Sequence, residues 1–421
     1  MDTLAHYTNK TPLATADQLR DQIISTRLAY KRIEFLFDYN HTKYNYLNIN
    51  GGPLLKIDED QPDAPPIKPN GLQALDELIF LDDIDSERNH INELSQELLK
   101  AVKFIEKSQT VHELEDFKLI EAIRSGIVRV FTLGVTGFDT PGSVNAISES
   151  EESLRVMLEA FQRFEVGLEG LAKKEYKSVI KLFQQGINQL QVQSFEEFDR
   201  MSFLRESINP LYKGLRNFVV LNKINTKQFK NHGQNYATDN LFDSEFLDSD
   251  FYQELSYMPL DNPQSIALGK VLFYDPILSH NLKMSCATCH APEKAFTDGL
   301  PTSESNVKGR FTKRNAPTLI NATYAKRYFH DLRSANLERQ IPHVFDNPEE
   351  FNLSFSEAIK RLQKSDKYLQ LFEDAYDGIS NKSDINQRSI SNALAAYVNT
   401  LVSFDSPFDQ YVRNGNNSYP A

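Results

Sequence analysis

The pentapeptide Cys286-Ala287-Thr288-Cys289-His290 holds the only two cysteines of this 421-residue chain. Two cysteines within four residues of each other cannot build the disulfide framework of a small secreted scaffold. Their spacing, with a histidine directly after the second cysteine, is that of a c-type haem attachment site. There the two thiols bond to the porphyrin, and the histidine is the proximal ligand of the iron. The pentapeptide therefore predicts covalent haem on Cys286 and Cys289, with His290 as the axial ligand.

Other sites share part of this spacing. A structural zinc site needs four ligands, and the chain has no second cysteine pair. A thioredoxin-like redox pair belongs beside a βαβ unit, and the surrounding sequence shows no alternating strand pattern. Chance occurrence of so short a motif stays open on spacing alone.

The composition excludes some functions. The chain carries 58 acidic and 46 basic side chains, a net charge of −12, which argues against a nucleic-acid partner. No apolar run approaches the roughly 18 residues that a membrane-spanning helix needs, so we expect no integral membrane segment.

Apolar periodicity indicates a mainly α fold. We expect an all-α bundle over residues 1–228, an acidic linker over 229–260 and a cytochrome c-like haem domain with long loops over 261–421. In the bundle, apolar side chains recur at the three- and four-residue spacing of a helical face in three series: Ile91, Leu94, Leu98, Val102 and Ile105; Leu154, Leu158, Phe161, Phe164, Leu168 and Leu171; Val179, Phe183, Ile187 and Leu190.

Several blocks around the pentapeptide occur in a fixed order. They are Leu268-Gly269-Lys270-Val271-Leu272-Phe273-Tyr274-Asp275-Pro276, Ala295-Phe296-Thr297-Asp298-Gly299, Arg314-Asn315-Ala316-Pro317-Thr318 and Leu337-Glu338-Arg339-Gln340, with Ser406-Pro407-Phe408-Asp409 at the end. Over about residues 262–413 the chain resembles the N-terminal haem domain of the bacterial di-haem cytochrome c peroxidases, a family that includes the MauG-like enzymes.

The resemblance implies a distal pocket on the peroxide side of the haem. By register, the family's distal Phe, Gln and Glu fall on Phe329, Gln340 and Glu350. A base must move a proton between the two peroxide oxygens, which is the role expected for Glu350. Gln340 would orient the peroxide, and Phe329 would keep water out of the pocket. The resemblance also implies an interdomain calcium ion, for which Asn315 matches one ligand.

The sequence departs from the family in three places. It has no histidine between His290 and His330 and no methionine after Met284, so we expect an iron without a protein sixth ligand, open to peroxide.

His330 stands where the family has a tryptophan. It is read as a hydrogen-bonding surface residue, a distal ligand or a replacement electron relay.

The third departure is the family's C-terminal haem domain, which is missing. We expect either a truncated chain or a single-haem variant, in which Tyr324 or Tyr328 could carry a radical or an external donor could supply the electron.

The helix following Lys68-Pro69-Asn70 resembles a segment of the imelysin family that carries a GxHxxE motif. Here Gln73 takes the place of the histidine and Asp76 that of the glutamate. Gln is a poor metal ligand, so we expect no metal there. An ordinary amphipathic helix is the better interpretation of this segment.

Together these features predict an exported, periplasmic c-type haem peroxidase that lost its leader. It would reduce hydrogen peroxide with electrons from a donor such as a small cytochrome. The alternatives are a non-catalytic electron-transfer cytochrome and MauG-like oxidation of a protein or organic substrate. The sequence does not indicate the oligomeric state.

Overall fold

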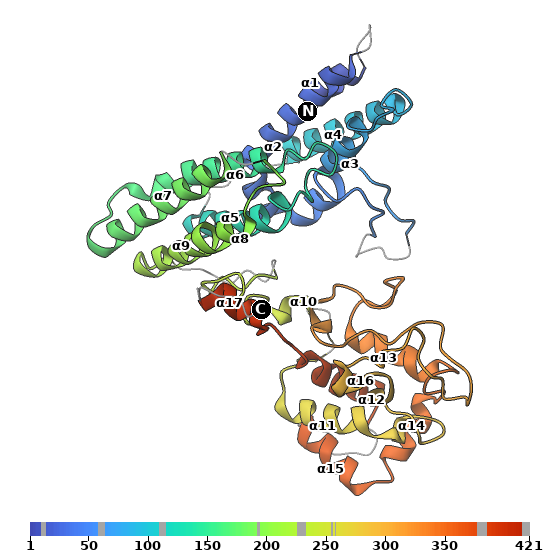
Figure 1. The fold of residues 1–421 in the computed structure, drawn as a ribbon. Helices are drawn as coiled ribbons and strands as arrows, with labels where there is room; N and C mark the ends of the chain where they lie inside the picture. Colours follow the sequence, from blue (N-terminus) through green and yellow to red (C-terminus); the bar gives the residue numbers. More distant parts are fainter. Residues whose placement is uncertain are drawn as a thin grey trace. The chain divides into compact units, whose positions relative to one another are not determined.

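The computed structural model describes residues 1–9, 14–57, 64–108, 115–191, 194–224, 233–253, 256, 258–376 and 385–414. Within these residues the regular structure is helical, and β pairing is limited to isolated bridges such as Lys56 with Ile67 (Figure 1). The predicted mainly α fold is therefore confirmed. The chain forms two compact units: unit 1 is Met1–Phe229, Gln234–Phe246 and Phe408–Ala421, and unit 2 is Lys230–Gly233 and Leu247–Pro407.

Unit 1 is a bundle of α-helices interrupted by single π-helical turns. Its elements are α1 (Asp2–Thr8), α2 (Ala16–Tyr44), η1 (Asn45–Ile49), α3 (Gly71–Ile79), α4 (Arg88–Ser108), α5 (Asp116–Arg129), η2 (Val130–Gly134), α6 (Ala146–Gln162), η3 (Arg163–Glu165), α7 (Gly170–Leu190), α8 (Arg200–Phe203), η4 (Leu204–Ile208), α9 (Asn209–Leu221) and, at the end of the chain, α17 (Pro407–Asn414).

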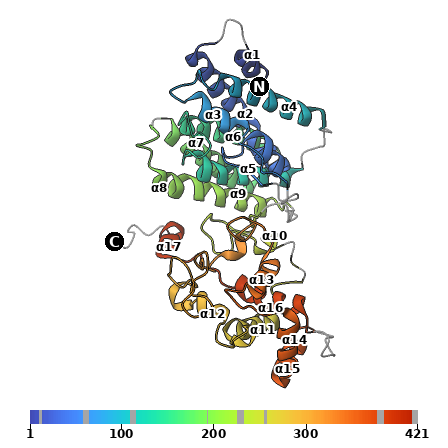
Figure 2. The same cartoon turned by 90° about the vertical axis from the view of Figure 1, so that its right-hand side faces the viewer.

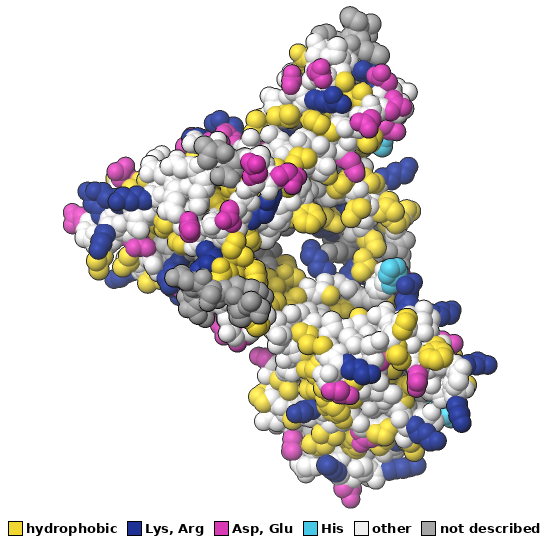
Figure 3. Space-filling model, viewed as in Figure 1, with side chains coloured by type: hydrophobic (Ala, Val, Ile, Leu, Met, Phe, Trp, Pro, Cys, Tyr) yellow, Lys and Arg dark blue, Asp and Glu magenta, His cyan; other side chains and the backbone are white. Residues whose placement is uncertain are grey.

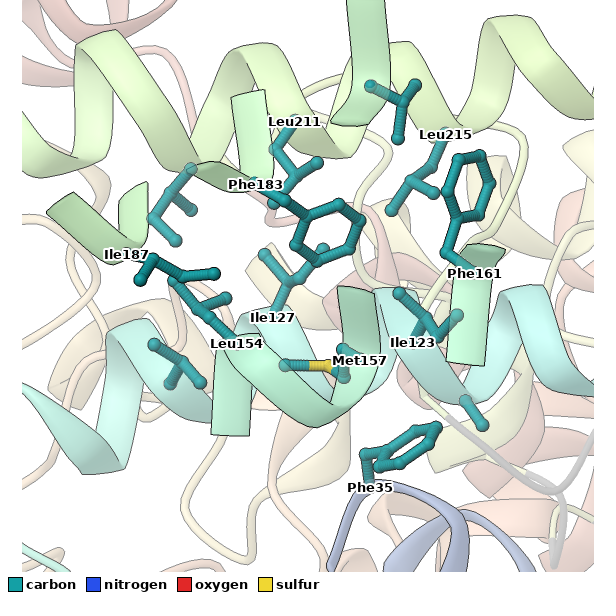
Figure 4. Packing of buried hydrophobic residues seen from close by; sticks show 14 of the residues in the cluster. Phe35, Ile123, Ile127, Leu154, Met157, Phe161, Phe183, Ile187, Leu211 and Leu215 are labelled. Carbon is teal, nitrogen blue, oxygen red and sulfur yellow. The ribbon is translucent and has the colours of Figure 1, made fainter. Parts of the chain in front are cut away.

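The main core of unit 1 lies between α5, α6, α7 and α9, which run side by side in Figure 1. Figure 4 shows its centre, where Phe161 of α6 and Phe183 of α7 meet Leu215 of α9. These three side chains are completely buried. The predicted apolar faces are thus the surfaces on which the helices pack.

One predicted helical face continues too far. The series from Leu154 places Leu168 and Leu171 on the same helix, but α6 ends at Gln162 and α7 begins only at Gly170. Gly167 at φ +78° turns the chain between them, and Leu171 is 70% exposed. Periodicity alone cannot reveal a break at which a glycine adopts the left-handed conformation.

The structure also divides the chain differently from the expected boundaries. Residues 225–232, which include the expected boundary at 228, lie outside the described residues. Beyond them, residues 234–246 belong to unit 1, because Arg124 of α5 donates hydrogen bonds to the carbonyl oxygens of Tyr236 and Thr238. Residues 408–421 also belong to unit 1, and Val412 is part of its core. Contacts between residues far apart in the sequence assign these segments, and composition does not disclose such contacts.

Unit 2 combines short helices with long loops, as predicted. Its elements are α10 (Ser249–Tyr252), α11 (Pro263–Tyr274), η5 (Pro276–Leu278), α12 (Cys286–Cys289), η6 (Pro292–Lys294), η7 (Ala322–Tyr324), α13 (Leu337–Asp346), α14 (Phe355–Leu362), α15 (Asp366–Ala375) and α16 (Gln387–Asn399).

The helices α11 and α16 form the centre of unit 2 and lie against each other in Figures 1 and 2. Gly269 of α11 makes this close approach possible, because a Cβ atom there would lie 1.7 Å from the carbonyl oxygen of Ala393. Leu268, Leu272 and Phe273 fill the core on either side of the glycine. A rigid pair of helices therefore supports the loops that carry the pentapeptide.

The surface shows acidic and basic side chains interspersed over the face seen in Figure 3. In the described part of the chain, no helix is both long and apolar enough to cross a membrane.

Candidate haem site

The pentapeptide forms one helical turn, α12 (Cys286–Cys289), in unit 2. A capping box starts this turn: the backbone N–H of Ser285 donates to Thr288 Oγ1 over 2.9 Å, and the Ser285 side chain accepts from the Thr288 backbone. The two cysteines are three residues apart and therefore lie on the same face of the turn. This arrangement suits a pair of thioether bonds to one porphyrin.

Both thiols are partly buried and free. Burial raises the pKa of Cys286 to about 12 and that of Cys289 to about 11. At neutral pH both are therefore neutral thiols rather than the reactive thiolates of a redox pair. This protonation state disfavours the thioredoxin-like interpretation.

His290 is held on the loop that follows. Its Nδ1 lies 3.0 Å from the carbonyl oxygen of Phe296. Burial lowers the pKa of His290, so the ring is neutral at neutral pH. A proton on Nδ1 leaves the lone pair on Nε2, the atom that would bind iron.

The acceptor of that hydrogen bond lies in a strained turn. Ala295 and Phe296 have φ angles of 54° and 58°, in the left-handed region that such side chains rarely adopt. Thr318 Oγ1 donates to the carbonyl oxygen of Ala295 over 2.6 Å and fixes the turn. The two motif blocks around Phe296 and Thr318 therefore act together to orient the histidine.

Glu350, the predicted base, lies near the cysteines. Its carboxylate is among the charges that raise the pKa of both thiols. Asn347 Nδ2 donates to Glu350 Oε1 over 3.0 Å. Burial raises the pKa of Glu350, although Asn347 and the charge of Arg333 act in the opposite direction. A partly buried carboxyl group with a raised pKa near a haem attachment motif suits a role in proton transfer.

Phe329, the predicted apolar residue, joins the same neighbourhood through Arg333. It has a φ of +68°, and the Arg333 guanidinium carbon lies 3.6 Å from the centre of its ring. His343 of α13 meets the ring edge-on, with the ring centres 5.1 Å apart. Phe329 is therefore fixed between two cation-forming side chains, one of which also acts on Glu350.

Gln340 is half-buried on α13, three residues before His343 and so on the same face of the helix. The structure records no hydrogen bond of its side chain to another described residue. Charge effects on the pKa values thus link Glu350 with both cysteines and with Arg333, which stacks on Phe329. They do not by themselves connect Gln340 with Glu350.

The sequence analysis missed Arg333, Asn347 and His343. Asn347 had a readable signal, since an Asn three residues before a Glu at a turn is well placed to hydrogen-bond it. Arg333 and His343 reach Phe329 only through the turn at Phe329–Leu332 and through α13, so their roles depend on tertiary structure.

The remaining predicted ligands lie apart. Asn315 and His330 are exposed in unit 2. Across the described residues, no three His, Cys, Asp or Glu side chains are grouped so that they could hold a metal ion. A role of Asn315 in calcium binding stays a prediction.

Helix α3, which holds the predicted GxHxxE-like segment, contributes to a second buried polar group, in unit 1. Every residue from Gly71 to Asp76 is buried, whereas Glu77 is exposed. Gln73 Nε2 donates to Asp139 Oδ1 over 2.9 Å, and Asp76 Oδ2 accepts from the backbone N–H groups of Gly142 and Ser143. Both residues belong to a charge cluster that we define as Arg27, Lys31, Glu34, Gln73, Asp76, Arg129, Asp139 and Glu149.

The cations of the charge cluster occupy the space between its carboxylates. Arg27 binds Glu149 through two hydrogen bonds of 2.7 and 2.9 Å. Lys31 Nζ lies 2.7 Å from both Glu34 Oε2 and Asp139 Oδ2. Ion pairs therefore dominate the surroundings of Gln73 and Asp76.

Comparisons with known proteins locate the family resemblance in unit 2. Residues 263–417 match the family model of the di-haem cytochrome c peroxidases. The methylamine utilization protein MauG of Methylophilus methylotrophus is 36% identical over 159 residues, which cover 37% of this chain and 45% of that protein. The cytochrome c peroxidase Ccp of Escherichia coli K12 is 36% identical over 166 residues, or 39% of this chain and 34% of that protein.

The cytochrome c551 peroxidase of Pseudomonas aeruginosa is 32% identical over 170 residues, which cover 40% of this chain and 47% of that protein. The chain thus spans less than half the length of these relatives. The donor set of two thiols on one turn and a neutral, oriented imidazole fits the c-type haem of this family. Residues 263–417 are therefore a domain of the di-haem cytochrome c peroxidase family.

Proposed function

We propose that this protein reduces hydrogen peroxide to water on a haem held by Cys286, Cys289 and His290, with electrons from an external donor such as a small cytochrome. The observation that carries the proposal is the position of Glu350. It is a partly buried carboxyl group with a raised pKa whose charge reaches both haem-binding thiols.

When bound, the haem supplies an iron that binds peroxide and exchanges electrons with it. The task of the chain is to move the proton. In its ionised form, Glu350 takes the proton from the peroxide oxygen nearer the iron and returns it to the oxygen that leaves as water. The hydrogen bond from Asn347 holds the carboxylate in one orientation for both transfers.

Phe329 and Gln340 complete the proposed pocket. The Phe329 ring, fixed by Arg333 and His343, excludes water from the space beside the carboxylate. Gln340, one turn before His343, offers an amide to orient the peroxide. The positive charge of Arg333 favours the carboxylate form of Glu350 that the first transfer requires.

We further propose that the protein works in the periplasm, because the haem-binding thiols must be reduced and then joined to haem outside the cytoplasm. The test therefore uses a chain exported together with a cytochrome c maturation system. A pyridine haemochrome spectrum and the mass of the protein report whether haem is attached.

The deciding experiment mixes the ferric, haem-loaded chain with equimolar hydrogen peroxide and follows its absorption spectrum. We expect a rapid change of the haem spectrum, reversed when a reduced small cytochrome is added. No change with peroxide would favour the electron-transfer cytochrome. A change that reduced cytochrome cannot reverse would favour MauG-like oxidation of another substrate.

The resting spectrum tests the open iron separately. A high-spin ferric signal is expected, because residues 291–329 contain neither His nor Met. A purely low-spin, bis-histidine spectrum would contradict it and would point to His330 or His343 as the sixth ligand.

A further inference from the structure

A chain of aromatic rings leads from the haem ligand to the surface of unit 2. Phe296, whose carbonyl accepts from His290, meets Phe273 of α11 edge-on, with ring centres 6.2 Å apart. Phe273 in turn meets Tyr397 of α16 at 5.1 Å. The hydroxyl oxygens of Tyr397 and Tyr274 lie 3.3 Å apart.

From Phe273 outward, exposure increases along this chain of rings. Phe273 is 2% exposed, Tyr397 is 7% exposed, and Tyr274 is 42% exposed. Tyr274 also borders a shallow surface hollow with Lys270, Val271 and Pro276. The last ring is therefore accessible to a reductant, whereas Tyr397 and Phe273 behind it are shielded from solvent.

We propose that Tyr274 and Tyr397 form a redox relay that brings electrons from the surface to the haem side of unit 2. This inference rests on the proposed peroxidase function, which supplies the oxidant. Tyr274 is the ring that is oxidised, and Tyr397 with Phe273 connects it to the haem ligand loop.

The electrons and protons of the relay balance. Reduction of one hydrogen peroxide to two waters takes two electrons and two protons. One electron comes from the haem and one from Tyr274, which releases its phenolic proton to water and becomes a neutral tyrosyl radical. A one-electron donor at the surface then reduces this radical, which takes a proton back from water. A second electron from the donor passes along the same rings and replaces the one taken from the haem.

Tyr397 makes this oxidation easier without being consumed. Burial, reinforced by the hydrogen bond with Tyr274, raises the pKa of Tyr397, so its hydroxyl keeps its proton. It can therefore donate a hydrogen bond to the oxygen of the Tyr274 radical. Because α11 and α16 are locked together at Gly269, the two hydroxyls stay within reach.

The other tyrosines considered for this role have different surroundings. The Tyr324 ring meets Tyr252 and Phe404, with ring centres at 5.5 and 5.2 Å. Tyr328 donates its hydroxyl hydrogen to the carbonyl oxygen of Ala322. Neither is recorded in contact with Phe273 or Phe296, so Tyr324 serves as a matched control.

The test is electron paramagnetic resonance of the haem-loaded chain, freeze-quenched after mixing with hydrogen peroxide. The wild type should give a tyrosyl radical signal. Tyr274→Phe should abolish it, Tyr397→Phe should weaken it or broaden it, and Tyr324→Phe should leave it unchanged. The haem absorption of each variant and its initial reaction with peroxide show that the site is intact.

A radical that persists in Tyr274→Phe while the haem still reacts with peroxide overturns the relay and leaves the proposed function standing. Loss of the radical in Tyr324→Phe overturns it as well and assigns the radical to Tyr324. If peroxide leaves the wild-type haem spectrum unchanged, the proposed function fails, and the relay fails with it.

Discussion

The charge cluster of unit 1 and the haem site of unit 2 both take titratable side chains out of water, and they compensate the cost differently. In unit 1, Arg27 and Lys31 lie within 2.7 Å of the carboxylates of Glu149, Glu34 and Asp139. In unit 2, Cys286 and Cys289 stay neutral, and burial shifts their pKa values upward.

The difference indicates whether each region needs a bound group to compensate its buried side chains. Charges that pair within the chain compensate one another without an added group. The neutral thiols and the oriented imidazole of unit 2 acquire bonding partners only when a further group binds there. We therefore expect unit 1 to depend on its ion pairs and unit 2 to depend on its haem.

The largest effect is expected from the double variant Cys286→Ala/Cys289→Ala. Without thioether bonds, the exported chain should carry no covalent haem and should lose all peroxide reaction. Unit 2 should also melt at a lower temperature than in the haem-loaded protein, since bound cofactor stabilises the folded state.

Calorimetry of the same double variant checks unit 1, whose unfolding transition should not move. A shift of both unfolding transitions by the same amount would show that the two units do not unfold independently. That result would contradict the expectation that only unit 2 depends on haem.

The converse change is Asp139→Asn in the charge cluster. It leaves Lys31 without one of its carboxylates and should cost unit 1 about 3–5 kcal/mol, as does the loss of one partner in a buried ion pair. Denaturant unfolding followed by circular dichroism measures this cost, and the haem spectrum should stay the same.

Asp17→Asn is the matched control. Asp17 pairs with Arg20 at 3.4 Å, but its side chain is 89% exposed. This exposed pair should contribute less than about 1 kcal/mol. Equal losses for Asp139→Asn and Asp17→Asn would mean that the cluster is not the stabilising feature of unit 1.

In unit 2, Glu350→Gln should slow the reaction with peroxide by about 10²- to 10⁴-fold, the usual range for the loss of an acid–base group. Haem content and the stability of both units should change little. Stopped-flow rates at several peroxide concentrations measure the effect, with Glu349→Gln as the control at the neighbouring carboxylate. Equal rates for Glu350→Gln and the wild type would remove Glu350 from the mechanism.

The smallest effect is a difference in pH dependence between the two regions. Neighbouring cations hold the pKa of Asp139 well below its usual value, so its contribution to stability is full above about 4 and is lost only in stronger acid. Glu149 affects the pH dependence of stability in the opposite direction. Burial of its charged carboxylate costs free energy and raises its pKa, so protonation in acid relieves part of this cost.

Burial raises the pKa of Glu350 above its usual 4.5, so the reaction with peroxide should slow as the pH falls through this raised value. On acidification, the peroxide reaction should therefore decline while unit 1 is still folded. Rate and circular dichroism profiles from pH 8 downward test this order. Unfolding of unit 1 before the rate declines would contradict it.

Much of the fold followed from local patterns. The helical faces around Ile91, Phe161 and Phe183 had the 3.6-residue period, and these residues are buried in α4, α6 and α7. The break after Gln162 did not follow, because it depends on a positive φ at Gly167. The assignment of residues 234–246 depends on hydrogen bonds from Arg124, more than 100 residues earlier in the chain.

The sequence alone predicted the covalent chemistry, because a thioether pair and its axial histidine must be adjacent along the chain, as Cys286, Cys289 and His290 are. Tertiary structure decided everything that acts through space. It brought Arg333 onto Phe329, Asn347 onto Glu350 and Tyr274 within hydrogen-bond reach of Tyr397. Such contacts join residues on different turns and helices, and only the packing around them sets their distances.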